Sequence, residues 1–119
     1  MQFTLSNAGT HVAASLSGAP TEADGLALLK SLLQASREKG IERALVEVRV
    51  AYGLDPASTQ SLIVAMPELG FPPSYRIAVL LLDDAARESA SFAEDVAVNR
   101  GIGVRVFSGR DEALGWLLS

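Results

Sequence analysis

Cysteine is absent from the 119 residues, which excludes disulfide bonds, thiolate catalysis and zinc sites built from cysteine. His11 is the only histidine, so a His-rich metal site is excluded as well, and its place in a hairpin predicts an exposed side chain. No run of lysine or arginine occurs, and the formal net charge is -4. An acidic chain without a basic patch is repelled by nucleic acids and by anionic membranes, so we expect neither as a partner.

Long apolar runs are absent too. No stretch approaches the roughly 20 residues that a membrane-spanning helix requires, so we expect no membrane insertion. Residues 1–4 lack the charged and apolar regions of a secretory signal, which leads us to expect a cytoplasmic protein. What is present is a globular composition, with 49% hydrophobic and 20% charged residues. The length predicts one domain over 1–119 that buries roughly two-thirds of its unfolded surface without a metal or a disulfide.

The strongest structural signal is the unbroken apolar run of residues 77–82. A run of this length, preceded by Pro-Pro-Ser and followed by Asp83 and Asp84, is typical of a strand buried on both faces of a parallel sheet. We therefore expect residues 75–84 to lie extended in the interior, with a hydrogen-bonded neighbour on each side.

Segments before and after this strand alternate between strand-like and helix-like patterns. Turn residues predict an opening hairpin over 3–6 and 12–16, and alternating or apolar stretches predict strands over 44–50 and 104–107. Pro67 is expected to kink or end the second helix, and Ser108 with Asp111 to form a capping box for the last one. The predicted helices open at Thr21, at Asp55, after Asp84 and at Ser108. The first ends at Gly40 and the third at about Asn99, while the second is kinked or ended at Pro67.

The fold class that this order predicts is α/β, a single and mostly parallel sheet with an N-terminal β-hairpin and four helices. Glu47, Arg49 and Arg105 occupy outward strand positions, which indicates that one sheet face is incompletely covered while the helices mass on the other. We expect an apolar row under that uncovered face, made by Leu45, Leu80, Leu82 and Phe107.

Asp55, Ser58 and Thr59 form the richest polar cluster, at a predicted helix N-terminus beyond the C-terminal end of a strand. Free backbone N–H groups at such a position can bind an anion, which makes the cluster a candidate ligand or phosphoacceptor site. The alternative is structural, because Asp55 before Pro56 is an ordinary helix opening in which the carboxylate caps the helix and the hydroxyls are solvated.

Asp83 and Asp84 end the predicted interior strand at the sheet edge where open α/β proteins place ligands, and two carboxylates can hold a divalent cation or share a proton. Adjacent strand residues point to opposite faces, however, and a role in a turn or a cap explains both. Arg100 offers a guanidinium to a phosphate or to a partner's carboxylate. The alternative is a helix end, where the helix dipole favours a cation.

The last third of the chain, together with the order of the elements, resembles the SpoIIAA-like group of small bacterial proteins. The stretches that carry the resemblance are FAEDVAVNRG at 92–101, VRVF at 104–107 and EALGWL at 112–117. That group is related to the STAS domains of anti-sigma factor antagonists and, more distantly, to CRAL-TRIO lipid-binding domains. The resemblance implies a STAS-like fold over the whole chain, and either a protein partner or an apolar ligand.

Anti-sigma factor antagonists carry a phosphorylatable serine in an Asp-Ser-Ser-Gly or Asp-Ser-Thr-Gly motif, at the start of the helix after the third strand. The corresponding place here reads Asp-Pro-Ala-Ser-Thr-Gln over 55–60, so the aspartate matches while proline and alanine occupy the hydroxyl positions. This departure argues against the family's phosphorylation switch, although Ser58, Thr59 and Ser61 remain nearby hydroxyls.

These observations favour a non-enzymatic STAS-like binding or regulatory module that engages a protein partner and uses no cofactor, because the sequence shows no set of nucleophile, base and orienting residue. One alternative is a carrier of a small apolar or lipid-like molecule on the uncovered sheet face, where a second copy could instead pack as a homodimer. Another is an enzyme, which would require Asp55, Asp83 or Asp84 to converge with Arg100 in a pocket.

Overall fold

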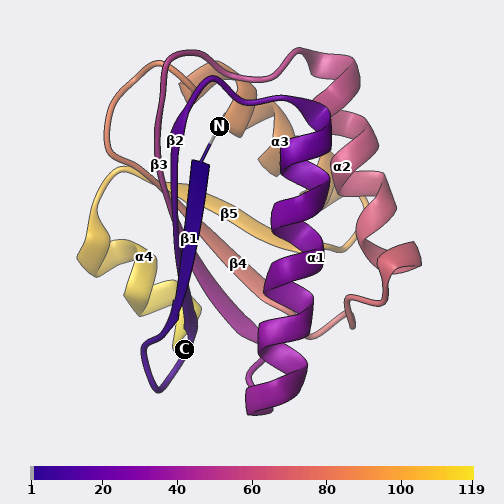
Figure 1. Cartoon of the computed structure of the whole chain (residues 1–119), viewed down its shortest axis with the longest axis vertical. Coiled ribbons are helices and arrows are strands. Elements are labelled where there is room, and N and C mark those ends of the chain that lie inside the picture. The colour runs from indigo at the N-terminus through magenta and orange to yellow at the C-terminus, as the bar shows by residue number, and fades with distance from the viewer. Residues whose placement is uncertain (1) are drawn as a thin grey trace.

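The fold is a five-stranded sheet flanked by four helices (Figure 1), in a computed structural model that describes residues 2–119. The elements are β1 (Gln2–Asn7), β2 (Val12–Gly18), α1 (Glu22–Lys39), β3 (Arg43–Val50), α2 (Pro56–Leu69), β4 (Arg76–Leu81), α3 (Arg87–Asn99), β5 (Gly103–Phe107) and α4 (Arg110–Leu117). The predicted α/β class, with its opening hairpin and four helices, is confirmed. Within residues 2–119, no helix is both long and apolar enough to cross a membrane.

The strands lie in the order β1-β2-β3-β4-β5, with β1 antiparallel to β2 and all other neighbours parallel. β4 pairs with β3 on one side and β5 on the other, so that Val79 lies opposite Val46 and Val106. The prediction of an interior strand is therefore confirmed. The strand itself ends at Leu81, and the side chain of Leu82 is 41% exposed.

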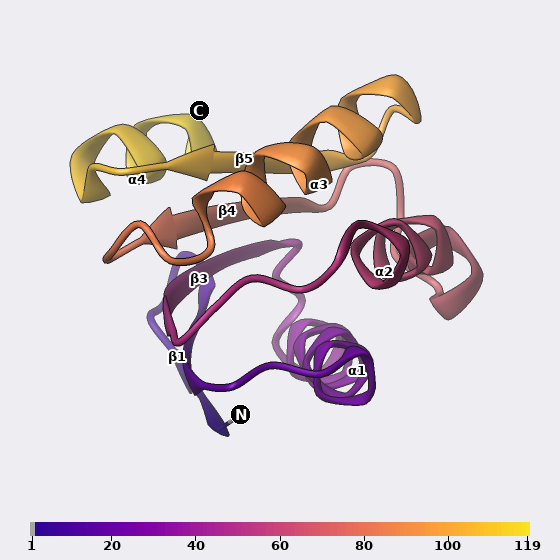
Figure 2. The same cartoon turned by 90° about the horizontal axis from the view of Figure 1, so that it is seen from above.

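The larger core lies between the sheet and helices α1, α2 and α3, a side that we call the three-helix face (Figure 2). Alternate strand residues, such as Val46 and Val48 of β3, point toward it. Leu29 and Leu32 of α1 pack on these strands from the apolar stripe of their helix. Three amphipathic helices thereby bury one side of four parallel strands.

The opposite side of the sheet, which we call the α4 face, carries a smaller second core. Leu45 and Leu80 are each 2% exposed there, and they pack with Ala113 and Leu117 of α4. The prediction that all helices mass on one face is wrong, and so is the prediction that Leu45, Leu80 and Phe107 lie uncovered. The physical reason is that the last helix folds back across the sheet and uses these side chains as its own packing surface.

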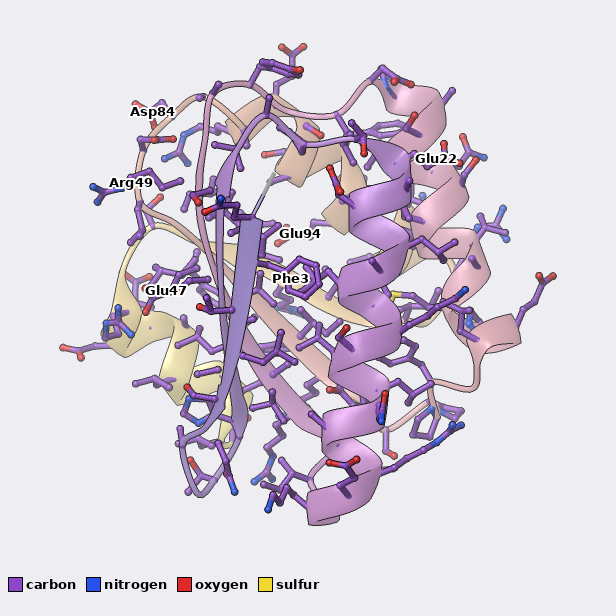
Figure 3. The ribbon with its side chains drawn as sticks, in the orientation of Figure 1. Phe3, Glu22, Glu47, Arg49, Asp84 and Glu94 are labelled. Carbon is purple, nitrogen blue, oxygen red and sulfur yellow. The ribbon has the colours of Figure 1, made fainter. Side chains whose placement is uncertain are left out.

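Helix α4 covers only part of its face. Thr4 of β1 and Ser15 of β2 remain exposed, and Arg49 of β3 points away from the sheet in Figure 3. Glu47 of β3, nearer to α4, forms an ion pair with Arg110 at the start of that helix. Incomplete cover is therefore confirmed for the hairpin half of this face, where the exposed side chains are small and hydroxylated.

The first two helices begin where local chemistry predicts. The hydroxyl of Thr21 accepts a hydrogen bond from the backbone N–H of Asp24 at 3.2 Å, and the carboxylate of Asp55 caps α2 in the same manner. Pro67 was expected to kink or end α2, and the second of these alternatives is wrong, because the helix continues to Leu69. A proline in the last turn removes only one backbone hydrogen bond, which the helix tolerates.

The predicted capping box at the start of α4 is also wrong. The N-cap of this helix is Gly109, and no side chain caps it. The Ser108 hydroxyl instead accepts a hydrogen bond from the Arg87 guanidinium at 3.0 Å. A tertiary contact to the start of α3 has thus replaced the local one.

Candidate functional site

A partly open cavity of about 200 Å³ lies between the sheet and the helices of the three-helix face. Its walls come from strands β2 to β5 and from all three helices of that face. Only two of its lining residues, Thr59 and Ser89, carry a polar side chain. The apolar lining includes Leu16, Leu28, Leu29, Leu32, Val48, Val50, Leu54, Leu62, Ile63, Met66, Ile77, Val79 and Leu81. An apolar cavity of about 150 Å³ suffices to bind benzene, so a space of this size and lining can take up a small hydrophobic molecule.

Small residues on the surrounding helices create this space. Helix α3 presents Ala90 and Ala93 to the cavity, where longer side chains would fill it. On α1, a Cβ atom at Gly25 would lie 2.5 Å from Cδ1 of Leu62, so the glycine brings α1 and α2 into direct contact. Helices α1 and α2 are thus in close contact beside the cavity. The short side chains of Ala90 and Ala93 on α3 leave a volume that no neighbouring side chain fills.

The cavity adjoins an open groove of about 670 Å³ between the β3–α2 loop and α3. Gly53, Leu54 and Ser89 line both spaces and therefore form the boundary between them. A Cβ atom at Gly53 would lie 2.5 Å from Cβ of Ser89, so a larger residue would push the loop away from α3. The groove follows the C-terminal end of β3, which is where open α/β sheets commonly bind ligands.

Two hydroxyl groups mark this boundary. Oγ1 of Thr59 on α2 lies 3.2 Å from Oγ of Ser89 on α3, and the Thr59 residue is only 5% exposed. Each hydroxyl has hydrogen-bonding capacity beyond this one contact. The pair can therefore hydrogen-bond the polar end of a molecule whose apolar part fills the cavity.

The groove outside the cavity is acidic. Glu88 and Asp95 of α3 line it, and none of its lining residues is basic. A carboxylate placed there would lose hydration and meet like charge, both of which disfavour its ionised form. The electrostatics of the site thus favour an uncharged polar group over an anionic one.

Of the predicted cluster at 55–59, two residues are engaged with each other. Oδ1 of Asp55 accepts from the backbone N–H of Ser58 at 2.8 Å, and Oδ2 accepts from the Ser58 hydroxyl at 2.9 Å. The bond from the backbone N–H first, and then that from the hydroxyl, hold the pKa of Asp55 below its ordinary value. Asp55 thus caps the helix by accepting from Ser58, while Thr59 turns inward to the cavity.

The other predicted site residues lie apart. Asp83 accepts a hydrogen bond from the backbone N–H of Ala85 at 3.2 Å, and Asp84 forms an exposed ion pair with Arg87 at 2.8 Å. Arg100 stands at the far end of α3, a helix of 13 residues and so about 20 Å long. The structure therefore does not bring Arg100 together with the aspartates.

His11 is buried, which makes the prediction of an exposed hairpin histidine wrong. The residue is 9% exposed, and its Nδ1 atom lies 2.9 Å from the Thr10 hydroxyl. Burial lowers the pKa of the imidazole from its ordinary value of 6.5. Within residues 2–119, no three histidine, cysteine, aspartate or glutamate side chains are grouped so as to hold a metal ion.

The fold and the cavity together define an open-sheet α/β protein with a partly open, apolar cavity between its sheet and three of its helices. No protein-family model matches the chain, and the search of curated proteins returns no match.

Sequence reasoning missed Gly53, Leu54 and Ser89, which form the boundary of the cavity. A usable signal was present in α3 and its N-cap, where alanine recurs on the inward side at positions 86, 90, 93 and 97. Three- and four-residue spacing places these short side chains on one side of the helix, and such a row leaves volume unfilled wherever the opposing residues do not compensate.

Proposed function

We propose that this protein is a non-enzymatic binding module that carries a small apolar molecule with an uncharged polar end. The observation that supports this function is the nearly all-apolar cavity beside two hydroxyls and an acidic groove. The resemblance of the sequence to the SpoIIAA-like group, with its distant lipid-binding kin, favours the same class of function.

The size of the cavity limits the ligand. Benzene, with six carbon atoms, fits an engineered cavity of about 150 Å³, so a space of 200 Å³ takes an apolar group of about eight carbons. A long acyl chain does not fit unless the helices separate. We therefore propose a medium-length chain or a substituted ring as the occupant.

The polar end of the ligand is proposed to lie at the Thr59 and Ser89 hydroxyls. An alcohol there exchanges hydrogen bonds with both groups and adds no charge to a groove that already contains Glu88 and Asp95. A fatty acid of the same length would have to bind protonated or accept repulsion. An alcohol is thus the preferred representative of the ligand class.

A second candidate function is the engagement of a protein partner, as the STAS resemblance implies. The specific observation in its favour is the open half of the α4 face, where Thr4 and Ser15 are exposed beside Arg49. This part of the sheet is extended and has no helix over it, and arginine is among the residues that are enriched at protein interfaces.

The experiment that tests the proposal is a melting and titration series with 1-octanol and octanoate as probes. We expect saturating octanol to raise the melting temperature by about 3 °C or more, because a ligand bound only by the folded state stabilises it. Octanoate at neutral pH should bind more weakly than octanol. Isothermal titration gives the stoichiometry, which should be one probe per chain.

Matched variants of α3 locate the binding site. Ala93→Leu fills the cavity and should abolish the octanol shift, whereas Val98→Leu, at a position that is 58% exposed on the same helix, should leave it intact. An octanol shift that survives Ala93→Leu would show that the probe binds elsewhere. If neither probe binds the wild-type protein, the carrier proposal fails and the protein-partner candidate takes its place.

A further inference from the structure

The two edge strands of the sheet, β1 and β5, differ in how well they are protected against pairing with a further strand. At the β5 edge, the backbone N–H of Val106 points away from β4 and donates to Oε2 of Glu94 on α3 at 2.6 Å. Figure 2 shows β5 with both α3 and α4 close by. A charged side chain bonded to the free side of a strand blocks the addition of another strand. The β5 edge is therefore closed.

The β1 edge has no comparable protection. Within residues 2–119, no backbone group or side chain outside the hairpin hydrogen-bonds to the outer side of β1. The strand reads Gln-Phe-Thr-Leu-Ser-Asn and contains no charge and no proline, which are two of the devices with which edge strands avoid pairing. β1 therefore presents an unprotected row of hydrogen-bonding groups.

The alternation of hydrogen-bonded and non-hydrogen-bonded pairs along the hairpin shows which backbone groups of β1 point outward. The backbone N–H of Ala8 bonds to the carbonyl of His11, so in the antiparallel ladder Thr4 and Ser6 bond to β2 in turn. The N–H and C=O groups of Phe3 and Leu5 point outward. The side chains of these two residues lie on the three-helix face, where the Phe3 ring sits between β1 and α1 in Figure 3.

The hairpin carries almost no charged side chains, so it is the side on which a second copy of this acidic chain is repelled least. Residues 2–18 contain no acidic or basic residue other than His11, whereas the rest of the chain carries every charge behind the net value of -4. Two copies of an acidic protein repel each other least where neither presents a charge. A second copy is thus the partner that this edge fits best.

We propose that two copies of this chain pair through β1 in antiparallel fashion, with Thr4 at the two-fold axis, to form a continuous ten-stranded sheet. In this register Phe3 lies opposite Leu5 of the partner subunit, and their outward groups form the hydrogen-bonded pairs. Thr4 faces Thr4 of the partner subunit in the close, non-hydrogen-bonded pair. The arrangement is self-complementary, as a two-fold interface requires.

Sedimentation equilibrium on charge variants at position 4 tests this proposal independently of the cavity. The wild-type protein should sediment at twice its 12.5 kDa chain mass. Thr4→Lys places like charges in direct opposition and should raise the dimer dissociation constant by about tenfold or more, as should Thr4→Glu. An equimolar mixture of the two variants should restore the dimer as a heterodimer.

Ser15→Lys provides the matched control, because Ser15 is exposed on the same face and pairs with Thr4 across the hairpin, one strand further from the axis. This variant should remain as dimeric as the wild type, and circular dichroism should show all variants folded. A monomeric wild type at millimolar concentration overturns the proposal. So does a Thr4→Lys protein that stays dimeric, or a mixture that fails to associate, because either result removes Thr4 from the axis.

Discussion

The two faces of the sheet bury their side chains in different ways. On the α4 face a few residues are completely enclosed, with Ala78, Ala113 and Leu117 at 0% exposure. The three-helix face buries many more residues and still contains a cavity of about 200 Å³. The number of buried residues is therefore a poor guide to how completely a core is filled. A filled core holds the fold together, and an unfilled one offers room for a ligand.

The core beneath α4 is filled because polar and aromatic contacts fix the position of this helix. The Arg76 guanidinium donates to the backbone carbonyls of Trp116 at 2.9 Å and Ser119 at 3.0 Å. The Cζ atom of Arg76 also lies 5.4 Å from the centre of the Trp116 ring. The ring centres of Trp116 and Phe107 are 5.9 Å apart. These contacts hold the C-terminal end of α4 to the sheet, so the small helix docks in one place.

The largest effect that we predict is for Leu117→Ala on the α4 face. Removing a fully buried leucine from a filled core leaves a new cavity and should lower the free energy of unfolding by about 2–5 kcal/mol. Leu118→Ala is the control, since Leu118 is 40% exposed and its loss should cost about 0.5 kcal/mol or less. Urea denaturation measures both. Equal losses would mean that α4 is not docked as described and that the contrast between the faces is false.

A smaller loss is expected for Tyr75→Phe, which tests how tightly the three-helix face is constrained away from its cavity. The Tyr75 hydroxyl lies 2.5 Å from the Ser36 hydroxyl, and the two residues are 3% and 4% exposed. Burial raises the pKa of the Tyr75 phenol. The variant leaves the Ser36 hydroxyl without its buried partner, so we expect a loss of about 1–3 kcal/mol.

The same denaturation assay applied to Tyr52→Phe gives the reference for this second prediction, because Tyr52 is 54% exposed and should tolerate the change. If Tyr75→Phe proves as harmless as Tyr52→Phe, the hydroxyl pair does not hold α1 to the segment before β4. The whole three-helix face would then have to be regarded as loosely packed, and not only the part around its cavity.

The strands and the starts of the first two helices could be predicted from sequence because each depends on a short-range pattern. The apolar run at 77–82 indicates a strand buried on both faces, and the alternating apolar residues that include Val46 and Val48 indicate another strand. Thr21 and Asp55 each accept a hydrogen bond from the backbone N–H three residues further on, which begins a helix. These patterns do not say which face of the sheet a helix will cover. The position of α4 depends on Arg76 and Trp116, which lie 40 residues apart.

The candidate site could be predicted only in part, for a similar reason. Thr59 was singled out together with Asp55 and Ser58, as part of either a ligand site or a helix start with solvated hydroxyls, and its actual neighbour is Ser89 on another helix. The cavity is defined by volume that side chains do not fill, which depends on how three helices approach the sheet. Gly53 and Ala93 gain their significance only from what faces them. Sequence patterns show which residues are buried, but they do not show where buried space is left over.

The smallest effect that we predict concerns His11, a buried polar residue of the hairpin that belongs to neither core. Its folded-state pKa is lowered below 6.5, so the unfolded chain binds the proton first as the pH falls. The stabilisation that comes from keeping the imidazole neutral is therefore complete above pH 6.5. It decreases as the pH falls below that value, until the folded form is protonated as well.

His11→Gln should remove this part of the pH dependence, so that its free energy of unfolding falls less than that of the wild type between pH 7 and pH 5. No other histidine contributes in that window, and ordinary carboxyl groups titrate mainly below it. Urea denaturation at several pH values compares the two slopes. Parallel slopes would indicate that the imidazole is protonated equally easily in the folded and unfolded states. The hairpin end of the sheet would then be open to water, in contrast to both packed faces.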